Sequence, residues 1–127
     1  MSRSVIAVVD DMFFASKIRA AAEAVGVEIS FPRSKEALVE KARETAPQLI
    51  LVDLHNQKLD PVGLAKELKA NEDLGGIQLV GFFSHVETEL RQNALAAGYD
   101  QVLPRSVFSR DLPKILTTDY TDGGGLT

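Results

Sequence analysis

Two apolar stretches that each end in aspartate, VIAVVDD (Val5–Asp11) and QLILVDL (Gln48–Leu54), stand in the first half of the chain. Runs of valine, isoleucine and leucine without polar alternation are typical of strands buried on both faces, as in a parallel sheet covered by helices. Such sheets bind ligands at the carboxyl ends of their strands, near the point where strand order reverses. If the two strands are neighbours, Asp10, Asp11 and Asp53 therefore converge on one small site.

The composition narrows the class of protein. The chain has 127 residues, of which 45% are hydrophobic and 25% charged, and its net charge is −4. This length suits one domain with a good core, and the negative charge makes nucleic acid or an anionic membrane an unexpected partner. Cysteine is absent, which excludes disulfides, thiol catalysis and thiolate metal sites. We expect a cytoplasmic protein, because neither a signal-peptide pattern nor an apolar window of about 20 residues is present.

Strand-like and helix-like patterns alternate five times along the chain. The other strands are expected at Val27–Phe31, Ile77–Phe83 and Gln101–Leu103. Val27–Phe31 alternates in polarity, as a strand at a sheet edge does. The alternation predicts a doubly wound α/β fold with a parallel sheet and right-handed crossovers.

Apolar residues at helical spacing separate these strands. Ser34 is expected to cap the second helix, and Pro113 to shorten or kink the last one. Residues 1–117 form the predicted domain, and residues 118–127 lack periodicity and are expected to be a disordered tail. The helices are expected at about residues 14–25, 35–45, 61–71, 86–98 and 108–116.

Further motifs appear in a fixed order along the chain. Pro47 precedes the second buried stretch, Ser84-His85 follows the fourth strand, and AAGYDQVLPR (residues 96–105) leads through the fifth. Together with the two strands that end in aspartate, these motifs resemble the receiver domains of two-component response regulators, the CheY-like family. The resemblance spans residues 4–116. It implies a five-stranded parallel sheet of order 2-1-3-4-5 with helices on both faces, in which the first and third strands are neighbours.

The resemblance implies that Asp53 accepts a phosphoryl group. It also implies that Asp10, Asp11, Asp53 and the backbone carbonyl of His55 bind Mg²⁺, whereas the His55 side chain is expected to be solvated. These residue types suit the chemistry, because a carboxylate can attack phosphorus to form an acyl phosphate and Mg²⁺ prefers oxygen ligands. Carboxylates packed together repel one another, which raises at least one pKa unless a cation neutralises them.

Two further residues of the site follow from the resemblance. Ser84 matches the family's serine or threonine that contacts a phosphoryl oxygen, and Arg105 stands where the family has lysine. A hydroxyl and a cation suit phosphoryl transfer, which depends mostly on positioning and charge stabilisation. Structural alternatives remain open: Ser84 with Glu87 fits a helix capping box, Arg105 fits a surface cation paired with Asp53, and Asp11 fits the N-cap of the first helix.

Several positions depart from the family pattern. Arginine is a planar fork that binds carboxylates through two hydrogen bonds, unlike lysine, so Arg105 could hold Asp53 or displace the metal. His85 is expected to narrow the access of a phosphodonor. Ser106 stands where proline is usual, and Val102 stands where many members carry an aromatic switch residue.

Three functions stay open. The first is a stand-alone receiver, which takes phosphate from a histidine kinase or phosphotransfer protein and signals through protein contacts of residues 85–116. Such a domain is not an enzyme beyond its own phosphorylation and dephosphorylation. The second is a pseudo-receiver that acts as a phosphorylation-independent interaction module. The third, a phosphohydrolase or nucleotide-binding enzyme, is disfavoured because Asp10 and Asp11 are adjacent and the turn after the first strand has no glycine to cradle a phosphate.

Overall fold

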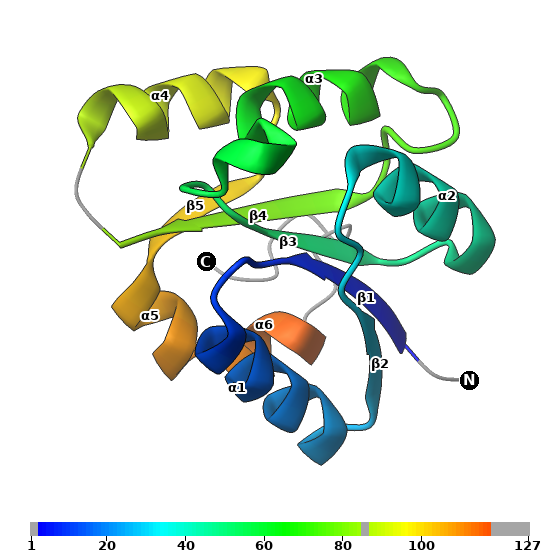
Figure 1. Ribbon diagram of the computed structural model, residues 1–127, viewed down its shortest axis with the longest axis vertical. Coiled ribbons are helices and arrows are strands. Elements are labelled where there is room, and N and C mark those ends of the chain that lie inside the picture. Colours follow the sequence, from blue (N-terminus) through cyan, green and yellow to red (C-terminus); the bar gives the residue numbers. More distant parts are fainter. Residues whose placement is uncertain (1–2, 85–86, 118–127) are drawn as a thin grey trace.

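A five-stranded parallel sheet forms the centre of the computed structural model, which describes residues 3–84 and 87–117 (Figure 1). The strand order is β2-β1-β3-β4-β5, and every neighbouring pair is parallel. The predicted fold class and strand order are confirmed, and so is the position of the second strand at an edge. The strands are β1 (Arg3–Val8), β2 (Val27–Ser30), β3 (Leu49–Asp53), β4 (Gln78–Phe83) and β5 (Gln101–Pro104).

Helices cover both faces of the sheet. Figure 1 shows α2, α3 and α4 on one side and α1, α5 and α6 on the other. Within the described ranges, no helix is long and apolar enough to cross a membrane. The helices are α1 (Met12–Ala24), α2 (Lys35–Thr45), α3 (Pro61–Ala70), α4 (Thr88–Ala97), α5 (Arg105–Arg110) and α6 (Leu112–Thr117), with a short 3₁₀ turn η1 (Gln57–Leu59) before α3.

The central strands explain why the two opening stretches are apolar throughout. Every side chain of residues 5–8 and 49–52 is 0% exposed. Successive side chains of a strand point to opposite faces, so Ile6 and Ile50 join the core under α2, α3 and α4, whereas Val5 and Leu49 join the core under α1, α5 and α6. Both faces need apolar side chains, and no polar alternation is possible.

Two helix boundaries confirm the sequence analysis and one corrects it. The Ser34 hydroxyl accepts from the backbone N–H of Ala37 at 3.0 Å and caps α2 as predicted. The last helix is divided at Asp111 into α5 and α6, with Pro113 in the first turn of α6, where proline is tolerated. The capping-box alternative for Ser84 is wrong, because α4 begins at Thr88 and its N-cap residue is Glu87.

The fourth helix begins at Thr88 rather than at about residue 86. Two predictions fall on residues outside the described ranges. They are the narrowing of the site by His85 and the disordered tail of residues 118–127. They stay predictions.

Candidate functional site

The site lies at the carboxyl edge of the central strands. β1 and β3 run side by side, with Val8 opposite Val52. Asp53 ends β3, and Asp10 and Asp11 form the turn that follows β1. The predicted neighbourhood of the two strands is therefore confirmed, and it results from parallel pairing, which brings the carboxyl ends of strands to one edge.

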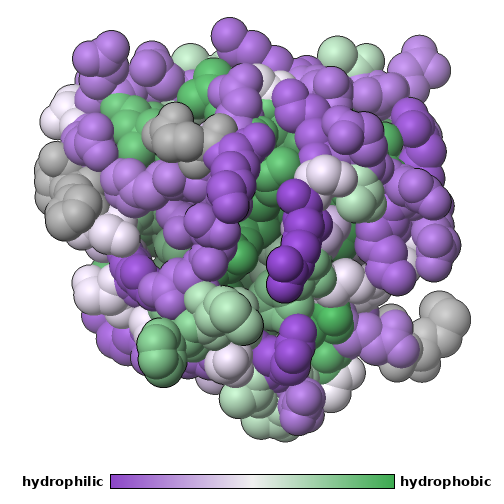
Figure 2. Space-filling model, viewed as in Figure 1, coloured by the Kyte–Doolittle hydropathy of each residue, from purple (hydrophilic) through white to green (hydrophobic). Residues whose placement is uncertain are grey.

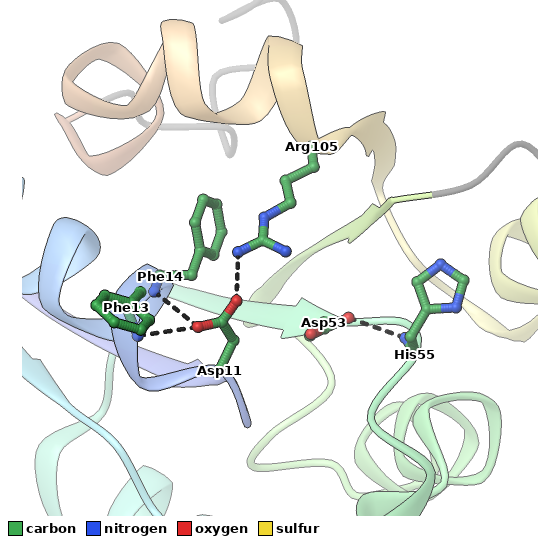
Figure 3. Close-up of polar contacts among 6 residues, drawn as sticks. All are labelled: Asp11, Phe13, Phe14, Asp53, His55 and Arg105. Atoms are coloured by element: carbon green, nitrogen blue, oxygen red, sulfur yellow. Dashed lines mark hydrogen bonds and ion pairs between the residues drawn. The ribbon is translucent and has the colours of Figure 1, made fainter.

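Asp11 is bound on both of its carboxylate oxygens. Its Oδ1 accepts from the backbone N–H groups of Phe13 at 2.9 Å and Phe14 at 3.2 Å, so Asp11 is the N-cap of α1. Its Oδ2 accepts from Nη2 of Arg105 at 2.8 Å (Figure 3). The capping alternative for Asp11 is confirmed. The expectation that Arg105 pairs with Asp53 is wrong, because the start of α5 places the guanidinium beside the turn after β1.

The guanidinium of Arg105 also contacts an aromatic ring. The guanidinium carbon lies 4.0 Å from the centre of the Phe14 ring, within the range of a cation–π contact. Phe14 packs in turn against Phe82 and Phe108, with ring centres 5.1 Å and 5.8 Å away. Arg105 is therefore fixed between a carboxylate and a buried aromatic cluster.

These contacts change the acidity of Asp11. The hydrogen bond from Arg105 lowers the pKa of the Asp11 carboxyl, and the backbone N–H groups of Phe14 and Phe13 lower it further. Hydrogen bonds and a nearby positive charge both favour the ionised form. Asp11 is therefore held as a carboxylate with a built-in counter-cation.

Asp53 has a different environment. Its Oδ1 accepts from the backbone N–H of His55 at 2.9 Å (Figure 3), and its Oδ2 accepts no hydrogen bond from the part of the chain that the structure describes. The His55 side chain lies near α4, where its Nδ1 is 3.6 Å from a carboxylate oxygen of Glu87. The side chain of His55 is 26% exposed and so is only partly solvated.

Asp10 and Ser84 complete the predicted set. The Asp10 carboxylate lies 3.9 Å from the Lys58 ammonium, and both side chains are well exposed. Ser84 directly follows β4, whose Phe82 is opposite Asp53 in the sheet. The Ser84 side chain is exposed. The sheet therefore brings β3 and β4, with Asp53 and Ser84, to one edge.

The oxygen ligands suit Mg²⁺ in kind but not in their present arrangement. Asp10, Asp11 and Asp53 offer carboxylates, which Mg²⁺ prefers. Yet no group of three acidic or imidazole side chains in residues 3–84 and 87–117 is placed to hold a metal ion. Asp11 has both oxygens committed to hydrogen-bond donors. A metal would have to exchange with Arg105 at Asp11, and the predicted ligand role of these residues stays a prediction.

Sequence reasoning missed three contributors to the site. Phe14 was expected only as part of the first helix, whereas its ring also contacts the Arg105 guanidinium. Lys58 pairs with Asp10, and Asn56 is only 9% exposed although it is polar. The spacing of Phe14 three residues after Asp11 was the available signal, since residues three apart on a helix are neighbours.

Comparisons with known proteins agree with this fold. No protein-family model matches the chain. Over 90 residues the chain is 29% identical to the response regulator protein VraR of Staphylococcus saprophyticus. The match covers 71% of this chain and 42% of that protein, so the chain spans less than half the length of this relative.

Solved structures match over nearly the whole chain. The CheY-like response regulator receiver domain protein of Methanospirillum hungatei has a TM-score of 0.78 and 18% identity, with 97% of this chain and 100% of that chain covered. The chemotaxis response regulator CheY4 of Vibrio cholerae has a TM-score of 0.78 and 16% identity, with coverages of 91% and 97%. The Mn²⁺-bound form of response regulator Rcp1 has a TM-score of 0.71 and 21% identity, with coverages of 90% and 88%. The chain therefore has the CheY-like receiver fold of response regulators.

Proposed function

We propose that the chain acts as a receiver that accepts a phosphoryl group on Asp53. The observation that carries this proposal is the position of Asp53 at the carboxyl end of the central strand β3, in a receiver fold, with one carboxylate oxygen held by the His55 N–H. Receiver domains are signalling domains, so the chemistry is limited to gaining and losing the phosphoryl group.

The transfer needs few groups from the protein. A carboxylate oxygen of Asp53 attacks phosphorus, the new O–P bond forms, and the bond between phosphorus and the donor's leaving group breaks. In this proposal Ser84 supplies the hydroxyl and Arg105 the cation that contact the phosphoryl oxygens. Arg105 would have to leave Asp11 to do so. When bound by Asp10, Asp11, Asp53 and the His55 carbonyl, Mg²⁺ would neutralise charge on the carboxylates and the phosphoryl oxygens.

The partners follow from the same proposal. The phosphodonor would be a histidine kinase or phosphotransfer protein, and the output would be a protein contact through residues 85–116. Support comes from the receiver fold, because the relative VraR is a response regulator. The chain carries a net charge of −4, which does not favour nucleic acid as the direct target.

Intact mass after incubation with acetyl phosphate and Mg²⁺ tests the acceptor. We expect a mass increase of one phosphoryl group in the wild type and none in Asp53→Asn. Asp73→Asn is the matched control, because Asp73 is an exposed carboxylate paired with Arg43 on the surface. Equal labelling of the wild type and Asp53→Asn would contradict the proposal, and so would its complete absence from the wild type.

A second candidate is a phosphorylation-independent interaction module, and the Arg105–Asp11 pair favours it. A guanidinium that neutralises Asp11 at 2.8 Å competes with a divalent cation. The affinity for Mn²⁺ measures this competition, and it can be determined from the paramagnetic broadening of NMR signals during a titration. We expect Arg105→Met to bind Mn²⁺ about ten-fold more tightly than the wild type, since charge-assisted hydrogen bonds are the strong ones. Arg110→Met, which breaks only a surface pair with Asp111, should not change the affinity.

The outcomes separate the two candidates. A wild type that binds Mn²⁺ and is labelled by acetyl phosphate is a phospho-accepting receiver. A wild type that does neither, while Arg105→Met binds Mn²⁺, is an interaction module whose metal site is closed by Arg105. Equal Mn²⁺ affinity in the wild type and Arg105→Met would show that the pair does not limit the metal.

A further inference from the structure

A cleft of about 320 Å³ opens beside the candidate site. Its walls are the N-terminal half of α1, the segment that follows β2, and the η1 turn. It opens on the face shown in Figure 2, where hydrophilic side chains surround a hollow with hydrophobic atoms at its base. The volume is at the lower end of the range of small-molecule pockets.

The charged groups of the cleft are mainly cations, although the protein as a whole is acidic. Arg19 from α1, Arg33 from the loop after β2, and Lys58 from η1 line it, and Asp10 is the single acidic residue among the lining side chains. Lys58 lies 3.9 Å from Asp10. Neither Arg19 nor Arg33 forms an ion pair with an acid in the described ranges. Three cations from three elements therefore face one cavity with one carboxylate between them.

Another part of the cleft lining is apolar. Phe31 and Pro32 form it on the side of the β2–α2 segment, with Val9 at the end of β1. The Arg19 guanidinium lies 4.9 Å from the centre of the Phe31 ring, so this arginine is positioned by the same wall. The cleft therefore offers a ligand both positive charge and apolar surface.

A largely buried amide side chain also lines the cleft. Asn56 lines it, is 9% exposed, and carries an Oδ1 atom that is buried and accepts no hydrogen bond from the residues that the structure describes. A buried acceptor without a donor costs free energy, of the order of 1–3 kcal/mol. The Asn56 side chain would have to turn toward the cleft for a donor group on a ligand to reach this atom and remove the cost.

We infer that the cleft binds a small molecule that carries a phosphate monoester on a flat, hydrogen-bonding body, as nucleoside monophosphates do. Arg19, Arg33 and Lys58 would bind the phosphate, and Phe31 and Pro32 would contact the body. Side-chain cations rather than backbone N–H groups would bind the phosphate, so the site needs no glycine-rich turn. The inference goes beyond the proposed function and does not depend on phosphorylation of Asp53.

The shape of the cavity argues for a small molecule rather than a macromolecule. The cations lie around a concave volume of about 320 Å³, whereas recognition of a membrane or nucleic acid needs a broad basic surface. Binding would also affect the neighbouring site, because a phosphate that takes Lys58 competes with Asp10 for the same ammonium group. Asp10 would then be freer to act as a metal ligand.

Titration of the full chain with AMP, followed by two-dimensional NMR, tests the inference. We expect saturable shifts at residues of the cleft, and an affinity for AMP at least about ten-fold higher than for adenosine or inorganic phosphate, each of which offers only half of the contacts. Arg19→Gln and Arg33→Gln should each weaken AMP binding by about ten-fold. Arg91→Gln, an exposed arginine of α4 away from the cleft, is the matched control and should leave it unchanged.

Three results would overturn the inference. The first is the absence of saturable shifts at about 10 mM AMP, which corresponds to negligible affinity. The second is equal weakening by Arg91→Gln and Arg33→Gln, which would show general attraction between charges. The third is an affinity for inorganic phosphate equal to that for AMP, which would show that the apolar wall does not contribute to binding. Asp53→Asn should bind AMP like the wild type, so failure of phosphorylation and failure of this site are distinguishable.

Discussion

At the scale of single residues, Arg105 has the largest effect on the site. Its guanidinium donates to Asp11 at 2.8 Å and lies 4.0 Å from the centre of the Phe14 ring. A lysine at this position could supply the charge but not the planar group that stacks on an aromatic face. One of the residues that depart from the family pattern is thus also the one that holds the Asp11 carboxylate.

Arg105→Met should raise the pKa of the Asp11 carboxyl, because the hydrogen bond from Arg105 is the main cause of its lowering. A carboxyl whose pKa is lower in the folded state stabilises the fold above its unfolded pKa, and this contribution is lost as the pH falls through the folded pKa. The loss of stability in Arg105→Met should therefore be largest near neutral pH and disappear in acid. NMR titration of Asp11 and urea denaturation against pH measure both effects. An unchanged Asp11 titration would contradict the assignment.

Gly81 is a second residue whose replacement is expected to disturb the site. A Cβ atom at this position of β4 would lie 2.8 Å from Cδ2 and 3.0 Å from Cγ of Leu54, which is buried and follows Asp53 directly. We expect Gly81→Ala to destabilise the protein by about 1–3 kcal/mol through overpacking. It should also shift the NMR signals of Asp53 and His55. Gly76→Ala, where a Cβ would meet nothing within 4 Å, is the control for urea denaturation.

At the scale of elements, caps decide where the helices begin and therefore where the site residues lie. Asp11 caps α1 and Asp60 caps α3 by accepting from the N–H of Gly63 at 3.3 Å. α1 starts directly after the turn that follows β1, whereas α3 follows β3 through the η1 turn. One carboxylate thus serves as a helix cap and as a partner of Arg105, which explains why a structural role and a site role coincide in Asp11.

Ser34→Ala tests a cap that is separate from the site. We expect a loss of about 1 kcal/mol in the free energy of unfolding, because the N–H of Ala37 loses its acceptor. Ser16→Ala is the matched control. Ser16 is exposed within α1, where alanine is the better helix former, so this change should not destabilise. Urea denaturation compares the two variants, and equal losses would show that the cap has no special effect.

At the scale of the whole molecule, two cores flank one sheet, and the helices on one face hold Arg105 in place. Phe108 of α5 stacks on Phe82 of β4, with ring centres 4.4 Å apart, and also contacts Phe14 of α1. These three rings join α1, the sheet and α5. The position of Arg105 at the start of α5 therefore depends on packing across the whole face.

Phe108→Ala should destabilise the protein by about 3–5 kcal/mol, the usual cost of emptying a buried aromatic site. Phe108 is 0% exposed, whereas Phe13 is 91% exposed. Phe13→Ala, the same chemical change at the surface, should alter stability little. Urea denaturation of both variants measures the difference. A loss below about 1 kcal/mol for Phe108→Ala would show that α5 does not depend on this packing.

The fold could be predicted from the sequence because its signals are local. Continuous apolar runs at residues 5–8 and 49–52 require burial on both faces, and the alternation of strands and helices limits the topology to a few forms. Helix ends were predictable where a cap such as Ser34 stands directly before the helix. They were not predictable at Ser84, because sequence spacing does not show which of several polar residues takes the N-cap position.

The sequence by itself determined the buried strands of a parallel sheet and the edge at which Asp10, Asp11 and Asp53 lie, since burial and parallel pairing place the carboxyl ends of strands together. The strand order was implied by the resemblance to receiver domains, and the structure confirms it. Only the tertiary structure decided that Arg105 pairs with Asp11 rather than Asp53. The physical reason is that a guanidinium at the end of a long side chain finds its partner through the packing of α5 on Phe14 and Phe82. That packing joins residues about ninety positions apart in the chain, and no local pattern encodes it.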